Sequence, residues 1–141
     1  MIIQQISVFL ENRSGRLTEV TAALGDQGIN ISALCIAETS DFGILRMVVS
    51  DVNKAQEVLR GRGFSLSVTQ VICLRVPNQP GAVNQALRIL SKASISIEYM
   101  YAFAVGAAAF VMIRTNDIEQ SIAVLLENKL TLIPASELHE S

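Results

Sequence analysis

The sequence predicts an α+β protein made of two βαββαβ modules in tandem, each an antiparallel four-stranded sheet with both helices on one face. Two observations support this fold class. The chain of 141 residues repeats itself, and in each half short β-branched strand patterns alternate with helical patterns in the order β-α-β-β-α-β. We place the two modules at about 1–69 and 70–141.

The repeat has a period of 66 residues, and shifting the sequence by that distance aligns the halves without a gap. The identical pairs are Ile6/Ile72, Asn12/Asn78, Gly15/Gly81, Leu24/Leu90, Ile29/Ile95, Ile31/Ile97, Asp51/Asp117, Leu59/Leu125 and Leu66/Leu132. Because loop glycines, helix stripes and an Ile-x-Ile strand keep one register, both halves should fold alike.

The elements of the first half are strand 3–10, helix 15–25, strand 29–38, strand 44–50, a helix that starts after Asp51 and stops at Gly61, and strand 64–72. Ser14 and Asp51 have the short polar side chains that favour helix N-caps. The turn at 40–43 should join two strands into a hairpin. The last strand can run on into the second module.

The elements of the second half are strand 71–76, a loop over 77–81, a helix with the stripe Val83, Ala86, Leu87 and Leu90, strands 95–104 and 108–115, helix 117–127, strand 130–134 and a polar tail over 136–141. Pro80 should lie just inside the start of its helix, where a proline is favoured. Each half therefore follows the split-βαβ, or ferredoxin-like, plan.

Charge and hydropathy exclude several classes of protein. The 11 Lys and Arg residues are scattered and the net charge is -2, which argues against a nucleic-acid partner. The first residues lack the basic start of a signal peptide. The longest apolar run, Tyr99 to Ile113, is shorter than the roughly 20 residues of a membrane helix. We expect a cytoplasmic protein without membrane contact.

Neither catalysis nor metal binding is predicted. The single histidine, His139, lies in the polar tail, so neither a Ser/Cys-His-Asp arrangement nor a metal site is expected. No phosphate-binding GxxxxGK[ST] loop is present and no cofactor is predicted. Cys35 and Cys73 form no CxxC motif. We interpret them as small buried residues in a reducing cytosol, with a disulfide as the alternative.

The chain is more apolar than two small cores need. Half of its residues are hydrophobic and the mean hydropathy is +0.42. Residues 99–105 and 107–113 do not alternate polar and apolar side chains as half-exposed strands do. Something other than helices should cover the second sheet face. We expect a homodimer or higher homo-oligomer, and a groove for a hydrophobic ligand is the alternative. Tyr99 and Tyr101 fit either a ligand pocket or core packing.

A loop with glycine before a helix occurs in both halves. It comprises Asn12, Arg13, Ser14, Gly15, Arg16 and Leu17 in the first, and Asn78, Gln79, Pro80, Gly81, Ala82 and Val83 in the second. Glycine permits close approach to the backbone, and amides at a helix N-terminus favour an anion such as a carboxylate. Asparagine both donates and accepts hydrogen bonds. The loops suit a zwitterion, although Asn, Ser and Gly are also common in ordinary caps and loops.

These residues resemble the ACT-domain pattern, roughly [DN]-x-P-G-x-L followed about a dozen residues later by [IV]-N-I. The second half has Asn78 to Val83 and then Ile95, Ser96 and Ile97, and the first half has Asn12 to Leu17 and then Ile29, Asn30 and Ile31. The resemblance covers nearly the whole chain. It departs from the pattern at Ser14, where proline is usual, and at Ser96, where asparagine is usual, so the two sites should differ.

The resemblance implies that paired modules bind an amino acid where they meet. The loop Asn12 to Leu17 would face Ser96, Ile97 and Glu98, and the loop Asn78 to Val83 would face Asn30, Ile31 and Ser32. Asn30 would read the polar end of the ligand, while amides near Gly15 and Gly81 would hold its carboxylate. Arg13 and Arg16 make the first loop more electropositive, which suits an acidic ligand.

The leading hypothesis is therefore a non-catalytic regulatory protein that binds a small amino-acid effector between modules and acts on a separate metabolic enzyme. One alternative is an oligomerisation or regulatory subunit of such an enzyme that binds no ligand. A small enzyme with an uncharacterised site is the other.

Overall fold

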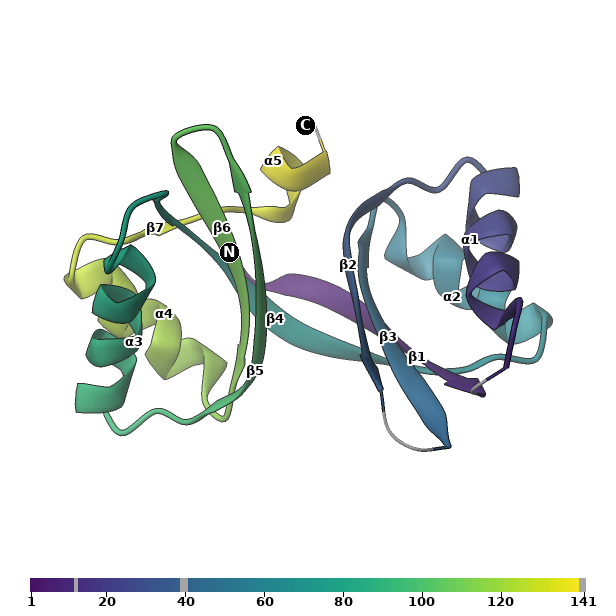
Figure 1. Cartoon of the computed structure of the whole chain (residues 1–141), viewed down its shortest axis with the longest axis horizontal. Helices are drawn as coiled ribbons and strands as arrows, with labels where there is room; N and C mark the ends of the chain where they lie inside the picture. Colours follow the sequence, from purple (N-terminus) through teal and green to yellow (C-terminus); the bar gives the residue numbers. More distant parts are fainter. Residues whose placement is uncertain (12, 39–40, 140–141) are drawn as a thin grey trace. The chain divides into compact units, whose positions relative to one another are not determined.

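The computed structural model describes residues 1–11, 13–38 and 41–139. Its elements are β1 (Ile3–Glu11), α1 (Arg16–Asp26), β2 (Ile31–Glu38), β3 (Phe42–Val49), α2 (Val52–Gly61), β4 (Ser65–Pro77), α3 (Ala82–Lys92), β5 (Ile97–Val105), β6 (Ala108–Thr115), α4 (Ile118–Glu127), β7 (Thr131–Leu132) and α5 (Ala135–His139). The predicted α+β class and the twofold β-α-β-β-α-β order are confirmed (Figure 1). No described helix is long and apolar enough to cross a membrane.

The chain divides into two compact units. We call Gln4–Thr69 the N-terminal module, and Gln70–Leu138 together with Met1–Ile3 the C-terminal module. Strand β4 is continuous through the junction between Thr69 and Gln70. It ends the first module and begins the second, so the strand does run on as the sequence suggested.

In the N-terminal module the strand order is β2-β3-β1-β4. Strand β3 pairs antiparallel with both neighbours, so that Met47 lies opposite Ile6 on one side and Leu34 on the other. Residues 45, 47 and 49 of β3 pack with β1 and with the apolar stripes of α1 and α2. Leu24 and Leu59 are the largest fully buried side chains of those stripes. Both helices therefore cover one face of the sheet (Figure 1).

The C-terminal module has the order β5-β6-β4, with β7 on the other side of β4. Leu74 of β4 lies opposite Val111 of β6 and Leu132 of β7. Leu90 of α3 and Leu125 of α4 are fully buried in its core. They are the repeat partners of Leu24 and Leu59, so identical sequence positions build both cores.

The entries into the helices confirm the predicted cap at Asp51 and correct the predictions for Ser14 and Pro80. Asp51 and Asp117 each accept a backbone N–H at 3.0 Å, from Lys54 and Gln120. The N-caps of α1 and α3 are instead Gly15 and Gly81, without side-chain capping. Ser14 is therefore not the cap, and Pro80 precedes the cap rather than lying inside the helix. The chain enters both helices through left-handed backbone, with φ of 90° and 84°, which only glycine adopts cheaply.

The C-terminal residues also differ from the expected polar tail. Residues 135–139 form α5, and Leu138 and Ile133 are buried. The preceding strand shrinks to Thr131–Leu132, because Pro134 cannot donate a ladder hydrogen bond. Burial of these two apolar side chains explains why the segment is ordered. The segment is too short to show a helical period in the sequence.

Candidate functional site

The loop after β1 makes a tight entry into α1. The N–H of Arg13 donates to the carbonyl of Glu11 at 2.8 Å, and the N–H of Glu19 donates to the carbonyl of Gly15 at 2.9 Å. The first amides of a helix have no intrahelical acceptor, so those that follow Gly15 are available to an anion. Asn12, a central residue of the predicted site, lies outside the described residues.

Arg16 is held from two sides. Its Nη1 donates to Glu19 Oε2 at 2.8 Å, and its guanidinium carbon lies 4.4 Å from the centre of the Phe64 ring, a cation–π distance. Its side chain is only 14% exposed. The Nε atom is buried and, within the described residues, has no hydrogen-bond partner. Arg13 is by contrast exposed and pairs with Glu11 at 3.6 Å.

A hollow of about 300 Å³ lies beside Arg16 in the N-terminal module. It is lined by Phe9, Leu10, Glu11, Arg16, Phe42, Gly63 and Ser65. A smaller hollow of about 120 Å³ shares Leu10, Glu11, Arg16 and Phe42 and also touches Arg13, Leu17, Ile36, Glu38 and Gly43. Arg16 therefore lies on the walls of both.

The loop after β4 is tied to its own module. The backbone N–H of Asn78 donates to the carbonyl of Ala107 at 2.9 Å, and its Nδ2 donates to the carbonyl of Gly106 at 3.2 Å. The N–H of Ala82 donates to the backbone carbonyl of Gln79 at 3.2 Å. The side chain of Asn78 thus holds the turn between β5 and β6.

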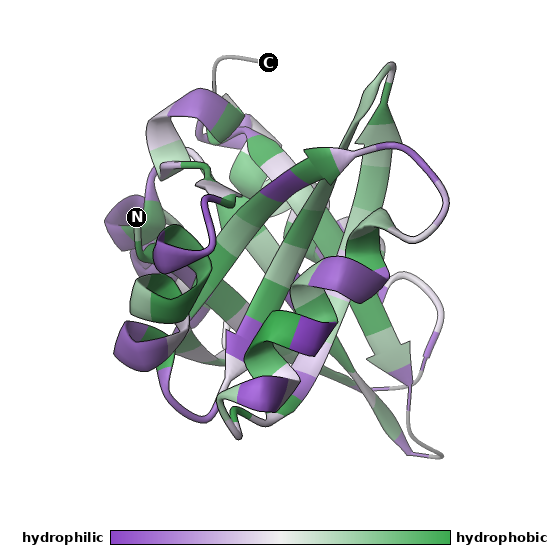
Figure 2. Ribbon diagram, turned by 90° about the vertical axis from the view of Figure 1, so that its left-hand side faces the viewer, coloured by the Kyte–Doolittle hydropathy of each residue, from purple (hydrophilic) through white to green (hydrophobic). Residues whose placement is uncertain are grey.

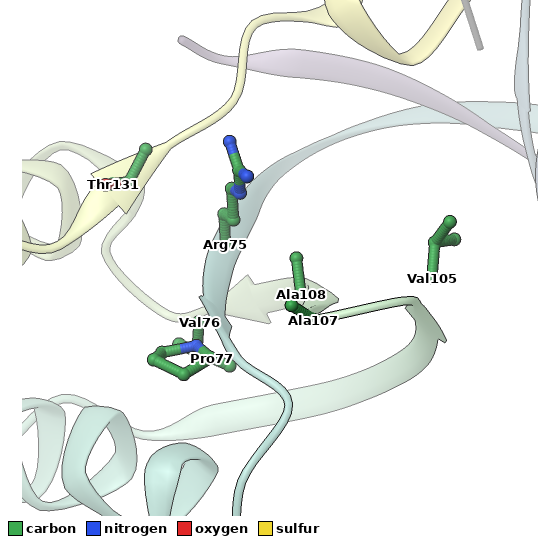
Figure 3. A pocket seen from close by; sticks show the side chains of 7 residues that line it. All are labelled: Arg75, Val76, Pro77, Val105, Ala107, Ala108 and Thr131. Carbon is green, nitrogen blue, oxygen red and sulfur yellow. The ribbon is translucent and has the colours of Figure 1, made fainter.

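The C-terminal module has a hollow at the corresponding place, with a volume of about 400 Å³ (Figure 3). Its walls are Arg75, Val76, Pro77, Val105, Ala107, Ala108 and Thr131. Five wall positions correspond through the repeat: Phe9/Arg75, Leu10/Val76, Glu11/Pro77, Phe42/Ala108 and Ser65/Thr131. The two hollows therefore share a position in the fold but differ in chemistry.

The predicted strand residues have their own partners. The N–H of Asn30 donates to Ser50 Oγ at 2.9 Å, and the N–H of Ser96 donates to Asn116 Oδ1 at 3.0 Å. These hydrogen bonds hold the start of β2 beside the end of β3, and the start of β5 beside the end of β6. The register then slips after Ile31 and again after Ile97.

Glu98, the residue at the second slip, pairs with Arg114 at 3.1 Å, and Arg114 Nη1 also donates to the carbonyl of Gln70 at 2.8 Å. Ser32 is the residue at the first slip. Within each module the structure brings the loop residues together. Their expected pairing with the strand residues 96–98 and 30–32 joins different modules and stays a prediction.

Phe9, Phe42 and Phe64 were not among the predicted site residues. Phe9 and Phe42 are exposed, and their ring centres are 6.3 Å apart. Glu11 lies opposite Phe42 in the β1–β3 register, whereas the predicted hairpin joins β2 and β3 and does not indicate this pairing.

The outer face of the C-terminal sheet is apolar. Tyr101 lies opposite Met112, and Phe103 lies opposite Phe110 with ring centres 5.4 Å apart. The neighbours Val111 and Ile113 belong to the core, so these side chains point away from α3 and α4. Figure 2 shows how apolar residues dominate the strands. Tyr99 and Tyr101 therefore lie outside the core of their module.

The cysteines are poor nucleophiles. Both are free, and burial raises the pKa of the Cys73 thiol to about 12. Burial also raises the pKa of Cys35, although neighbouring Arg46 opposes that shift. Only the thiolate attacks readily, so neither residue is prepared for catalysis. Within residues 1–11, 13–38 and 41–139, no cluster of three or more His, Cys, Asp or Glu could hold a metal ion.

Comparison with known proteins agrees with this architecture. Residues 1–141 match the family described as ACT domain pair. Protein BT0572 from Bacteroides thetaiotaomicron is similar, with 48% identity and a TM-score of 0.96 over 100% of this chain and 98% of that one. A search of curated proteins finds no match.

Regulatory subunits of aspartate kinase share the fold at 14% identity. The ligand-free form from Thermus thermophilus has a TM-score of 0.65 and covers 88% of this chain and 91% of its own. The subunit from Thermus flavus has a TM-score of 0.64 and covers 90% and 94%. Because the family match spans all the residues of the sequence, the chain belongs to the ACT domain pair family.

Proposed function

We propose that this protein is a non-catalytic, cytoplasmic regulator that binds a small amino-acid effector where its modules meet, within one chain or between copies. The proposed modules are 1–69 and 70–141, and the proposed partners are a second copy and a separate metabolic enzyme. The observation that carries the proposal is the repeated entry into α1 and α3 through Gly15 and Gly81. Helix N-termini favour anions such as carboxylates.

Other features support this proposal. The buried Cys73 and the ion-paired Glu98 offer no obvious catalytic group. The chain also shares its fold with regulatory subunits of aspartate kinase. The apolar outer face around Phe103 and Phe110 suits burial against a second copy.

A thermal-shift screen of the chain against the twenty amino acids tests the proposal. A ligand at 100 times its Kd should add about 2.7 kcal/mol, and a chain of this size should then melt roughly 9 °C higher if it unfolds as one unit. If none of the twenty amino acids changes the melting temperature, the chain is not an amino-acid sensor.

A ligand-free subunit is the second candidate, and the second loop favours it. Asn78 Nδ2 and the carboxylate of Glu98 are already satisfied inside the C-terminal module. If one enzyme copurifies with the chain in fixed stoichiometry and no amino acid alters that association, this second function replaces the first.

A further inference from the structure

Arg16 lines the hollow of the N-terminal module, and one edge of its guanidinium is only partly matched by other side chains. Nη1 is occupied by Glu19 and the plane lies over Phe64. On the other edge, Nε is buried without a hydrogen-bond partner in the described part of the chain, and Nη2 reaches Glu11 Oε1 only at 3.9 Å. Nε and Nη2 form the pair of donors that binds a carboxylate in bidentate fashion.

The orientation of this edge is fixed before any ligand arrives. The ion pair with Glu19 and the Phe64 ring hold the side chain on two sides. A ligand carboxylate would satisfy a buried, charged donor, and leaving such a donor unpaired is costly. Because the side chain is already ordered, binding would lose little rotamer entropy.

Glu11 supplies the opposite charge at the rim of the same hollow. Its carboxylate is largely exposed and lies near both Arg13 and Arg16. An α-amino acid has its ammonium and carboxylate on one carbon atom, so a cation site and an anion site a few ångströms apart match both groups. A simple carboxylic acid would leave Glu11 unmatched and would be repelled by it.

Most of the remaining wall is apolar and aromatic. Phe9 and Phe42 are 46% and 42% exposed, and with Leu10 they line the hollow beside the charged pair. An apolar ligand side chain would cover these rings and gain the hydrophobic contact that water does not provide. The volume of about 300 Å³ lies at the lower end for ligand pockets and suits a single amino acid.

We propose that this hollow binds an α-amino acid with an apolar side chain: Arg16 binds the carboxylate, Glu11 the ammonium, and Phe9 with Phe42 the side chain. The inference rests on the proposed effector binding and names a ligand class, and it places the ligand within the N-terminal module and not where modules meet. It replaces the acidic ligand that the sequence suggested for this loop, because Glu11 shares the site with Arg16.

The hollow of the C-terminal module cannot bind such a ligand in the same way. The repeat places Pro77, Ala82 and Ala108 where the N-terminal module has Glu11, Arg16 and Phe42. Arg75 is a cation on its wall, but no wall residue is an acid or an aromatic. The chain should therefore hold one such ligand, in the N-terminal module.

Calorimetric titration of the intact chain with leucine, isoleucine, valine, methionine and phenylalanine would identify the tightest probe. Its N-acetyl and amide derivatives then remove the ammonium and the carboxylate separately. Arg16→Gln and Glu11→Gln should each weaken the free amino acid roughly 10- to 100-fold, the effect of one charged hydrogen bond. Arg62→Gln is the matched control, because it removes an exposed charge next to Gly63 without touching the hollow, and it should change affinity less than about 2-fold. If Arg16→Gln does not fold, Arg16→Lys keeps the charge but loses the bidentate edge, and it should still weaken binding about 10-fold.

We expect one ligand per chain, and both derivatives should bind at least 10-fold more weakly. If an amino acid binds while Arg16→Gln and Glu11→Gln keep wild-type affinity, this site is wrong although the chain remains an effector-binding protein. Equal binding of the N-acetyl derivative, or binding of acidic amino acids alone, also overturns the site. If no amino acid binds the wild-type chain, both this inference and the proposed function are wrong.

Discussion

Replacing Gly81 by alanine should destabilise the protein by about 1 kcal/mol. Gly81 is the N-cap of α3 with φ +84°, and a Cβ atom there would meet nothing within 4 Å. The whole effect should therefore come from backbone conformation. Left-handed backbone destabilises the folded state by about 1–2 kcal/mol for an L-residue. Alanine also reduces the conformational entropy of the unfolded chain, which offsets about 0.4–1 kcal/mol of that loss.

Gly25→Ala provides a control with the opposite sign. Gly25 lies within α1 and is exposed, and a Cβ atom on it would likewise meet nothing within 4 Å, but its φ is not positive. Alanine should stabilise that helix by about 0.5–1 kcal/mol. Scanning calorimetry should show Gly81→Ala melting roughly 3 °C lower and Gly25→Ala melting higher. If Gly81→Ala is as stable as the wild-type chain, left-handed entry into α3 is not required.

Three further results are expected. Asp117→Ala should lower the free energy of unfolding, measured in urea, by about 1 kcal/mol, because the hydrogen bond from the N–H of Gln120 is lost. Asp117→Asn keeps an acceptor and should retain most of this stability. Equal losses in the two variants would contradict the capping role. Raising the pH from 8 to 10 should lower the free energy of unfolding by about 1.4 kcal/mol through Cys73 alone. The pKa of its thiol is 9.0 in the unfolded chain and about 12 in the folded protein, so only the unfolded chain releases the proton in this pH range. The contribution of Cys73 is thus fully present well below pH 9 and is lost above it, and the slope should be shallower in Cys73→Ala. Phe103→Glu places a charge on the apolar outer face and should lower the mass measured by sedimentation; an unchanged mass would remove that face from the proposed interface.

Local chemistry explains which structural features the sequence could predict. The cores follow from Leu24, Leu59, Leu90 and Leu125, because helical spacing alone determines which side of a helix is apolar. The cap at Asp51 is predictable because a cap bond spans only three residues. Ser14 was wrongly chosen because neighbouring serine and glycine are both acceptable caps, and only the backbone angle at the next residue decides between them.

Features that depend on tertiary pairing could not be predicted. The hollow beside Arg16 brings together Phe9 and Phe42, which are distant in the chain and meet only through the β1–β3 register. The bond from Asn78 to Gly106 likewise depends on the exact placement of a hairpin turn. Helix α5 could not be predicted because it is a short segment without a periodic pattern, and the burial of Leu138 depends on tertiary packing.

The uninterrupted strand β4 has a consequence for synthesis on the ribosome. Strand β1 lies between β3 and β4 in its module, so a nascent chain that ends before Ser65 exposes one edge of β1. Once residues 65–69 complete that sheet, residues 72–77 continue from it as an unpaired extension until β6 (Ala108–Thr115) has been made. Exposed strand edges recruit other chains. Between completion of the two modules, a newly made chain therefore carries an unpaired strand edge through which it can pair with other chains.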